Sequence, residues 1–248
     1  MPVTRIAMWS GPRNISTALM RSFENRPDCA VVDEPLYGYY LKTTGYNHPG
    51  GEDIVAAMDC NWQSVTHALC NVKPELCGVF YQKHMTQHLL PEVKLDFVDD
   101  LENCFLIREP RRIIASYRNI RSDFTLEELG FPQQWELFKR VADLRGHAPP
   151  VIDSAQLLRN PEANLRALCE RVGVGFSECM LRWPRGRRNS DGVWAPHWYA
   201  SVEESTGFQA QEEQPLKMVN IPAQYEDMCE RANCIYAALY EHALGANV

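Results

Sequence analysis

Short apolar runs alternate with helical segments along this chain, and that alternation restricts the fold more than any other sequence feature. The runs expected to be buried strands are 4–9, 29–32, 78–83, 103–108 and 150–153. Segments with helical periodicity are 15–25, 51–71, 133–146, 161–172 and 223–243, and Pro110 is placed to open a further helix. Strands that alternate with helices pair in parallel, and the helices cover both faces of the sheet. We therefore predict an α/β fold, a three-layer α/β/α arrangement around a central parallel sheet, as a single domain over residues 1–248.

The charge distribution limits the partners. The composition is ordinary for a globular protein, and the net charge of -7 disfavours broad binding of nucleic acid or of an anionic membrane. Arginines nevertheless cluster between Arg108 and Arg121 and again between Arg185 and Arg188. Such clusters are either solvated helix faces or a positive field directed at a small anion. We expect no nucleic-acid partner and no membrane association.

The nine cysteines are odd in number, form no Cys-x-x-Cys pair and show no zinc-ligand spacing with histidine. We therefore predict free thiols, no metal site and a reducing compartment, the cytoplasm. The first expected strand begins almost at residue 1, so we expect no signal peptide. The apolar runs are also too short to cross a membrane.

Three candidate functional segments follow expected strands. They are the loop 9–17 after the first strand, Glu34 after the second and Arg108 at the end of the fourth. Ligands of parallel sheets bind beyond the carboxyl ends of the strands. We therefore expect these segments to share one site.

The loop from Gly11 to Thr17 has the features of an anion site. The first backbone N–H groups of a helix lack partners, and the helix dipole adds partial positive charge there. Ser16 and Thr17 supply hydroxyl donors, and Arg13 supplies charged ones. The loop lacks the glycine and lysine of a Walker A motif, which disfavours an ATPase or a GTPase. The alternative is that Ser16 or Thr17 only caps the helix.

The segment 12–17, Pro-Arg-Asn-Ile-Ser-Thr, resembles the phosphosulfate loop of the sulfotransferases that use 3′-phosphoadenosine 5′-phosphosulfate (PAPS). That loop is Pro-Lys-Ser-Gly-Thr-Thr, so Arg13 stands in the place of the lysine. A second motif of the family pairs an arginine at a strand end with a serine eight residues later, and Arg108 and Ser116 have this spacing. The segment 185–188 is similar to the basic loop that closes on the 3′-phosphate. The resemblance is strongest to the bacterial and plant branch, with its Gly-Pro-Arg-Asn-x-Ser-Thr loop.

This resemblance implies the P-loop NTPase-like sulfotransferase fold and PAPS as co-substrate, with 3′-phosphoadenosine 5′-phosphate (PAP) as product. No metal is required where cations stabilise the charge of the transfer. The residues that the resemblance implies in nucleotide binding are Gly11, Pro12, Arg13, Asn14, Ile15, Ser16, Thr17, Arg108, Ser116, Arg185 and Arg188.

The resemblance also implies catalytic residues. Arg13 would stabilise the leaving group, although arginine is a poor proton donor compared with lysine. Lys83 would add a second cation, with a surface lysine at a strand end as the alternative. Glu34 is the first choice for the base that takes the acceptor's proton, and His84 is the second. The alternative for Glu34 is a carboxylate paired with an arginine, and the alternative for His84 is a hydrogen-bonded structural histidine.

We therefore predict a sulfotransferase that moves a sulfuryl group from PAPS to a hydroxyl of a small alcohol or phenol. A nucleotide- or partner-binding protein without transfer activity stays open, as does, with less support, a P-loop kinase. Residues 36–50, rich in tyrosine and glycine, are expected to form a loop beside the acceptor. Its tyrosines are Tyr37, Tyr39, Tyr40 and Tyr46. The sequence specifies neither the acceptor nor the oligomeric state.

Overall fold

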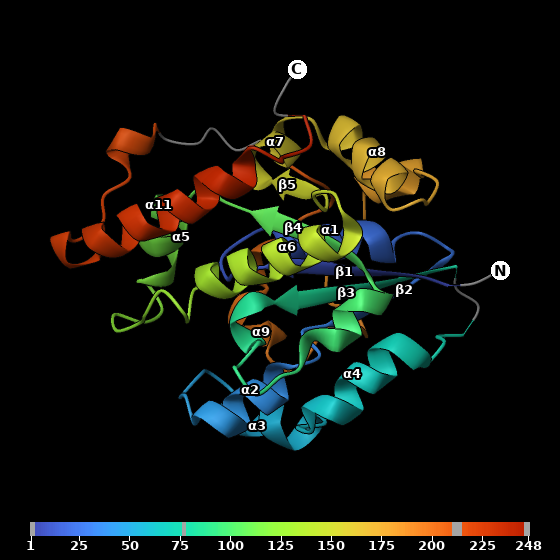
Figure 1. Cartoon of the computed structure of the whole chain (residues 1–248), viewed down its shortest axis with the longest axis horizontal. Helices are drawn as coiled ribbons and strands as arrows, with labels where there is room; N and C mark the ends of the chain where they lie inside the picture. The colour runs from blue at the N-terminus through green and yellow to red at the C-terminus, as the bar shows by residue number, and fades with distance from the viewer. Residues whose placement is uncertain (1–2, 76–77, 210–214, 246–248) are drawn as a thin grey trace.

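The computed structural model describes residues 3–75, 78–209 and 215–245, and a parallel sheet of five strands lies at its centre (Figure 1). The order across the sheet is β2-β3-β1-β4-β5, and every neighbouring pair is parallel. The strands are β1 (Thr4–Ser10), β2 (Cys29–Asp33), β3 (Val79–Met85), β4 (Glu102–Ile107) and β5 (Val151–Asp153). The predicted strands and their parallel pairing are confirmed. Since all strands run the same way, their carboxyl ends form one edge of the sheet.

Helices cover both faces of the sheet, which confirms the three-layer arrangement (Figure 1). On one face lie α6 (Phe131–Arg145) and α11 (Glu226–Tyr240), and on the other lie α1 (Ser16–Glu24) and α8 (Pro161–Arg171). The remaining α-helices are α2 (Tyr37–Thr44), α3 (Gly51–Ala57), α4 (Trp62–Asn71), α5 (Pro110–Tyr117), α7 (Ser154–Arg159), α9 (Ala195–Trp198) and α10 (Ala200–Glu203). Short 3₁₀ helices are η1 (Thr86–His88), η2 (Leu95–Asp100), η3 (Glu178–Leu181), η4 (Leu216–Met218) and η5 (Ala223–Tyr225).

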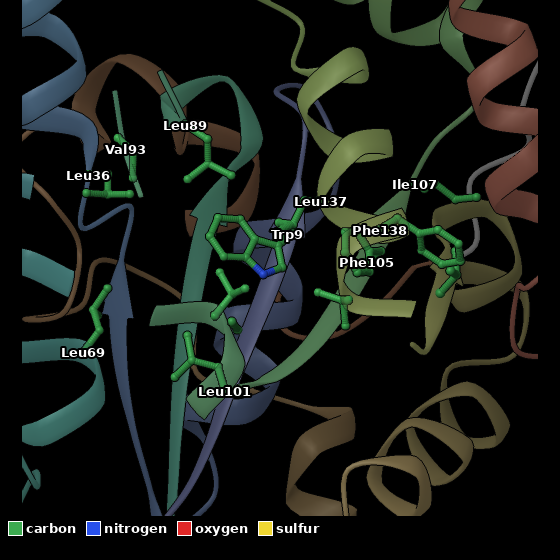
Figure 2. Packing of buried hydrophobic residues seen from close by; sticks show 14 of the residues in the cluster. Trp9, Leu36, Leu69, Leu89, Val93, Leu101, Phe105, Ile107, Leu137 and Phe138 are labelled. Carbon is green, nitrogen blue, oxygen red and sulfur yellow. The ribbon is translucent and has the colours of Figure 1, made fainter. Parts of the chain in front are cut away.

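The side chains of β1 alternate between two hydrophobic cores, because successive residues of a strand point to opposite faces of the sheet. Ile6 and Met8 pack on the face that α1 and α8 cover. Ala7 and Trp9 pack on the other face, where Leu137 of α6 lies beside the Trp9 indole (Figure 2). The same alternation in β3 decides which of its residues reach the functional site.

The segment predicted to be a loop at 36–50 contains the helix α2, so that prediction was wrong. Tyr37, Tyr40 and Leu41 lie on one face and pack in a small core with Ile54 of α3. This spacing of i, i+3 and i+4 is typical of an amphipathic helix. Gly45, with φ 67°, ends α2 in the left-handed conformation. The tyrosine spacing therefore outweighs the glycines in deciding the local structure.

The segment predicted to be mostly one helix at 51–71 forms two helices, α3 and α4. The chain turns extended at Met58, and the Asn61 side chain then accepts a hydrogen bond from the backbone N–H of Ser64. Asparagine is a favoured N-cap residue because its side chain satisfies a free N–H of the first turn. The cap therefore starts a second helix.

The eight cysteines within the described residues are free thiols, and Cys77 lies outside the described residues. No helix in the described part of the chain is long and apolar enough to cross a membrane. The cytoplasmic location and the single-domain organisation stay predictions.

Gly11 allows the loop after β1 to pass close to the backbone of Leu129. A Cβ atom at Gly11 would lie 2.6 Å from the Leu129 carbonyl oxygen, which is backbone and cannot turn aside. We predict that Gly11→Ala lowers the free energy of unfolding by about 1–3 kcal/mol, the usual cost of overpacking. Urea denaturation measures this loss.

Gly175→Ala is the matched control, because nothing lies within 4 Å of the Cβ that it would add. We expect that control to change the free energy of unfolding by about 0.5 kcal/mol or less. Equal stability of the two variants would contradict the close approach at Gly11.

Candidate functional site

A cleft of about 410 Å³ opens at the carboxyl ends of β1, β2, β3 and β4. Its lining includes the loop from Pro12 to Thr17, Glu34 after β2, Lys83 of β3 and Arg108 after β4. The three segments expected to share a site therefore line one cleft. The parallel direction of the strands brings them together.

The loop after β1 presents the uncapped start of α1 to the cleft. Helix α1 begins at Ser16, and no side chain caps its first turn. Asn14 fixes the loop instead, because its amide donates to the Leu106 carbonyl at 3.1 Å and its side-chain oxygen accepts from the Ile15 N–H at 2.9 Å. The backbone N–H groups of the first turn are therefore available to an anion, as expected for a phosphate-binding loop. The alternative, in which Ser16 or Thr17 caps the helix, is not observed.

Three of the residues expected to bind the nucleotide are linked by direct hydrogen bonds. Arg108 donates from Nη1 to the carbonyl oxygen of Arg13 at 2.7 Å. Arg13 in turn donates from Nε to the Ser116 hydroxyl at 2.9 Å. The strand end, the loop and helix α5 are thus joined around two guanidinium groups, which bind phosphate-like anions well.

Arg13 and Glu34 are strained. They have φ values of 56° and 43°, and no other non-glycine residue in the described part of the chain has a positive φ. This conformation costs roughly 1–3 kcal/mol per residue and persists where surrounding contacts enforce it, commonly at functional sites. Both residues line the cleft. The strain therefore marks the two strand ends that the sequence had singled out.

Lys83 is the centre of a buried network at the floor of the cleft. Its side chain is fully buried, and its ammonium donates to Asp33 Oδ1 at 2.7 Å, to Glu34 Oε1 at 2.5 Å and to the Tyr199 hydroxyl at 3.0 Å. Tyr199 donates in turn to Asp33 Oδ2 at 2.6 Å and accepts from the indole N–H of Trp194 at 3.0 Å. The three N–H donors of Lys83 are all used, so this residue is not the surface lysine that was the alternative.

The network shifts the protonation of its members. Burial alone would lower the pKa of Lys83, but Asp33, Glu34 and Tyr199 outweigh it and hold that pKa well above its usual value. Burial raises the pKa of Glu34, and Asp33 adds to this, while Lys83 partly opposes it. A carboxylate whose pKa is raised accepts a proton more readily than an ordinary glutamate.

His84 lies outside the cleft lining. It follows Lys83 in the same strand and so points to the opposite face, where its ring stacks on Trp9 with centroids 4.1 Å apart. Its Nε2 makes a 3.2 Å hydrogen bond with Gln82 Oε1. Burial, with a smaller contribution from Lys83, lowers the pKa of His84 to about 3. The structure therefore gives His84 the surroundings of a packed structural histidine.

Arg185 and Arg188 also lie outside the cleft lining. Arg185 is paired with Glu204 at 3.4 Å and donates from Nε to the Glu204 carbonyl oxygen. Arg188 lies 3.8 Å from Glu24 and donates to the carbonyl oxygen of Pro184. In this structure acidic side chains, rather than the cleft, face the two arginines.

An aromatic wall closes another side of the cleft, formed by Tyr37, Trp194, Trp198 and Tyr199. Of the tyrosines expected there, Tyr37 lines the cleft. Tyr40 packs behind it and Tyr39 belongs to the core on the other side of α2.

Tyr199 and His88 are not among the site residues predicted from the sequence, although both line the cleft, His88 one short turn after β3. The place of His88 directly beyond a strand end was a usable signal, whereas nothing local marks Tyr199. The described residues contain no cluster of three or more His, Cys, Asp or Glu side chains suited to a metal ion.

Comparison with known proteins identifies a family. A sulfotransferase domain model matches residues 4–243. Two proteins of Arabidopsis thaliana are similar to the chain along most of its length. Branched-chain-amino-acid aminotransferase-like protein 1 is 36% identical over 242 residues, which are 96% of this chain and 42% of that protein. Protein 2 of the same name is 32% identical over 237 residues, 96% of this chain and 41% of that protein. The chain thus spans less than half the length of these curated relatives.

Two solved sulfotransferase structures have the same fold. The sulfotransferase domain of the Synechococcus PCC 7002 olefin synthase has a TM-score of 0.57 at 17% identity, with 95% of each chain covered. The sulfotransferase of Alicyclobacillus acidocaldarius has a TM-score of 0.55 at 14% identity, with 99% of each chain covered. At these identities the likeness shows the fold, which is the P-loop-like fold expected from the sequence.

Lys83 holds two buried carboxylates in place. We predict that Lys83→Met lowers the free energy of unfolding by about 3–5 kcal/mol at neutral pH, because Asp33 and Glu34 stay buried without a cation. In the variant, the burial that raises the pKa of Glu34 is no longer opposed by Lys83, so the folded state binds more protons than the unfolded chain. The difference from the wild type therefore shrinks as the pH falls toward about 4. Urea denaturation at neutral pH and at about pH 4 measures this difference in the free energy of unfolding.

Lys139→Met is the control for this variant, since Lys139 pairs with Glu136 on the surface at 2.9 Å. Surface pairs contribute little, and we expect a loss of about 0.5 kcal/mol or less. A loss for Lys83→Met no larger than that of the control contradicts the role of the buried network.

Proposed function

Because the chain belongs to the sulfotransferase domain family, we propose that it transfers a sulfuryl group from PAPS to a hydroxyl of a small alcohol or phenol. The observation that carries the proposal is the pair of Arg13 and Arg108 at the uncapped start of α1, which line the same cleft as Glu34. Ser116 lies behind this pair and accepts a hydrogen bond from Arg13. An anion site and a candidate base therefore meet at one strand edge.

The donor side of the cleft suits a nucleotide with phosphate groups at two places. The first N–H groups of α1 and the Arg13 guanidinium suit the phosphosulfate. Arg108 and Ser116 suit the 3′-phosphate, as the family resemblance implies. PAPS itself supplies the activated sulfuryl group and the leaving phosphate.

Arg13 replaces the lysine of the family's usual loop, and this changes what the residue can contribute. Its guanidinium keeps its charge and can form two parallel hydrogen bonds to one anion, but it does not give up a proton. We propose that Arg13 stabilises the charge that builds on the leaving phosphate, with no role as an acid.

Lys83 is proposed as a positioning residue. Its three donors hold Asp33, Glu34 and Tyr199, which leaves none directed at a transferred group. This positioning role differs from the expectation from the sequence, in which Lys83 adds a second cation to the transfer site.

Glu34 is the proposed base. Its Oε1 is bound by Lys83, while its Oε2 lies 4.0 Å from His88 Nε2, too far for a hydrogen bond. A hydroxyl group beside these two atoms, at about 2.8 Å from each, would accept from His88 and donate to Glu34. His88 Nδ1 has no hydrogen-bond partner within the described residues, and an unpaired acceptor is more readily tolerated than an unpaired N–H. The neutral ring is therefore expected to carry its hydrogen on Nε2, facing Glu34.

The bonds, the proton and the charge of the proposed transfer can all be accounted for with these residues. The acceptor oxygen forms a bond to sulfur as the bond between sulfur and the leaving phosphate oxygen breaks. The hydroxyl proton passes to Glu34 Oε2. Arg13 and the N–H groups of α1 face the charge left on the phosphate.

The names of the curated relatives suggest amino transfer instead, which uses a lysine amine as nucleophile. Lys83 has a pKa held well above its usual value by the carboxylates around it. It therefore keeps its proton and offers no lone pair. This observation favours sulfuryl transfer for the cleft.

Arg108 is expected to recognise the 3′-phosphate. We predict that Arg108→Ala weakens binding of PAP by at least about tenfold, the loss of a charge-assisted hydrogen bond, and changes the binding of adenosine monophosphate much less. Calorimetric titration with the two nucleotides measures this. Arg166→Ala, which removes an exposed arginine of α8 that pairs with Glu162 at 2.7 Å, is the control and should bind PAP like the wild type. Equal weakening of both nucleotides by Arg108→Ala would count against the 3′-phosphate role.

Glu34→Gln separates binding from transfer. We predict that it binds PAP like the wild type and loses at least about a hundredfold in the rate of transfer from PAPS, the usual contribution of a positioned base. His84→Asn, which alters the histidine on the opposite face of β3, should retain the rate. If Glu34→Gln stays active and His84→Asn does not, the assignment of the base is wrong.

A further inference from the structure

A row of hydrogen-bonded polar side chains leads from a buried carboxylate to the aromatic wall of the cleft. It consists of Glu128, Arg121, His48 and Tyr37, and the last two line the cleft. Arg121 donates from Nη1 to Glu128 Oε1 at 2.7 Å and lies 3.3 Å from His48 Nε2. The other ring nitrogen of His48, Nδ1, lies 2.8 Å from the Tyr37 hydroxyl.

Arg121 determines which atom donates and which accepts in each hydrogen bond of this row of side chains. A guanidinium has no acceptor, so Arg121 must donate to His48 Nε2, which then carries a lone pair. Burial lowers the pKa of His48 to about 4, and Arg121 adds to this, so the ring is neutral near neutral pH. A neutral imidazole has one N–H, which must be on Nδ1. His48 therefore donates to the oxygen of Tyr37.

Tyr37 is left with a hydrogen to donate. Its oxygen already accepts from His48, and within the described residues its O–H has no hydrogen-bond acceptor other than that ring, which is occupied as a donor. Burial, followed by the charge of Glu34, raises the pKa of Tyr37, so the hydroxyl keeps its hydrogen. Tyr37 lines the cleft, so a ligand bound there that carries an acceptor oxygen can take this hydrogen bond.

The Tyr37 ring lies beside the proposed position of the acceptor hydroxyl. It stacks on the His88 ring with centroids 4.8 Å apart and planes 10° from parallel. His88 Nε2 in turn faces Glu34 Oε2. A molecule whose hydroxyl lies between His88 and Glu34 therefore has Tyr37 within reach of its next polar group.

We propose that Tyr37 selects acceptors that carry a carbonyl-type oxygen near the hydroxyl that is sulfated. This inference rests on the proposed function and names the chemical class of its acceptor. Tyr37 is a specificity residue that donates to that oxygen, and His48 and Arg121 are positioning residues that fix the direction of its O–H. A site with such a directed donor discriminates against an analogue that lacks the acceptor oxygen.

Matched pairs of acceptors test the inference. One pair is hydroxyacetone and methallyl alcohol, and the other is a hydroxybutanone and the corresponding isopentenyl alcohol. Within each pair a methylene replaces the carbonyl oxygen and the shape is nearly kept. We expect the wild type to prefer the carbonyl member by about tenfold in kcat/KM, the worth of one hydrogen bond. We expect Tyr37→Phe to abolish that preference by slowing the carbonyl member alone.

Tyr40→Phe is the matched control, because Tyr40 comes from the same helix and contacts His88 but is not part of the cleft lining. It should keep the wild-type preference. A wild type that sulfates both members of a pair equally, or a Tyr37→Phe variant that keeps the preference, overturns the inference and leaves the proposed function intact. Absence of transfer from PAPS to any member of either pair counts against the proposed function itself. The wild-type comparison holds even if a variant fails to fold.

Discussion

The geometry of the cleft depends on the buried ion pairs of Lys83 with Asp33 and Glu34. They join the ends of β2 and β3, and the bond from Lys83 to Tyr199 attaches a segment more than a hundred residues away in the chain. Removing one partner from such a network leaves a buried charge without compensation, so the members hold one another in place. One oxygen of Glu34 is thereby fixed, and the other lies 4.0 Å from His88 Nε2, close enough for a single hydroxyl group to contact both.

At the carboxyl edge of the sheet, two residues with strained backbone conformations are held in place by contacts from other elements. Arg13 and Glu34 have positive φ, and each is held by contacts from other elements: Arg13 by Arg108 and Ser116, Glu34 by Lys83. β1 and β2 are separated by β3 in the sheet, so the anion loop and the carboxylate flank Lys83. The arrangement offers positive charge on one side and a proton acceptor on the other, which is what group transfer to a hydroxyl needs.

Much of the fold and of the candidate site could be predicted from the sequence, and each wrong prediction has a physical cause. Apolar runs and the direction of parallel strands placed the loop, Glu34 and Arg108 at one edge, and the family resemblance added Lys83. Strand periodicity would also have shown that Lys83 and His84 cannot both face the cleft, because consecutive residues point to opposite faces. The helix at Tyr37 was missed although its spacing was visible. The links of Tyr199 to Lys83 and of His48 to Arg121 depend on tertiary packing between distant segments, which no local pattern records.

The central claim is that the cleft moves a sulfuryl group from PAPS to a hydroxyl oxygen. The most direct measurement follows radiolabelled sulfur from PAPS during incubation with the full chain and a mixture of hydroxylated acceptors, with chromatography of all labelled species. The account predicts that label passes to an organic acceptor while PAP appears in equal amount, and that the wild type does this in the presence of a metal chelator. Tight binding of PAPS with the label recovered only on the donor would contradict it.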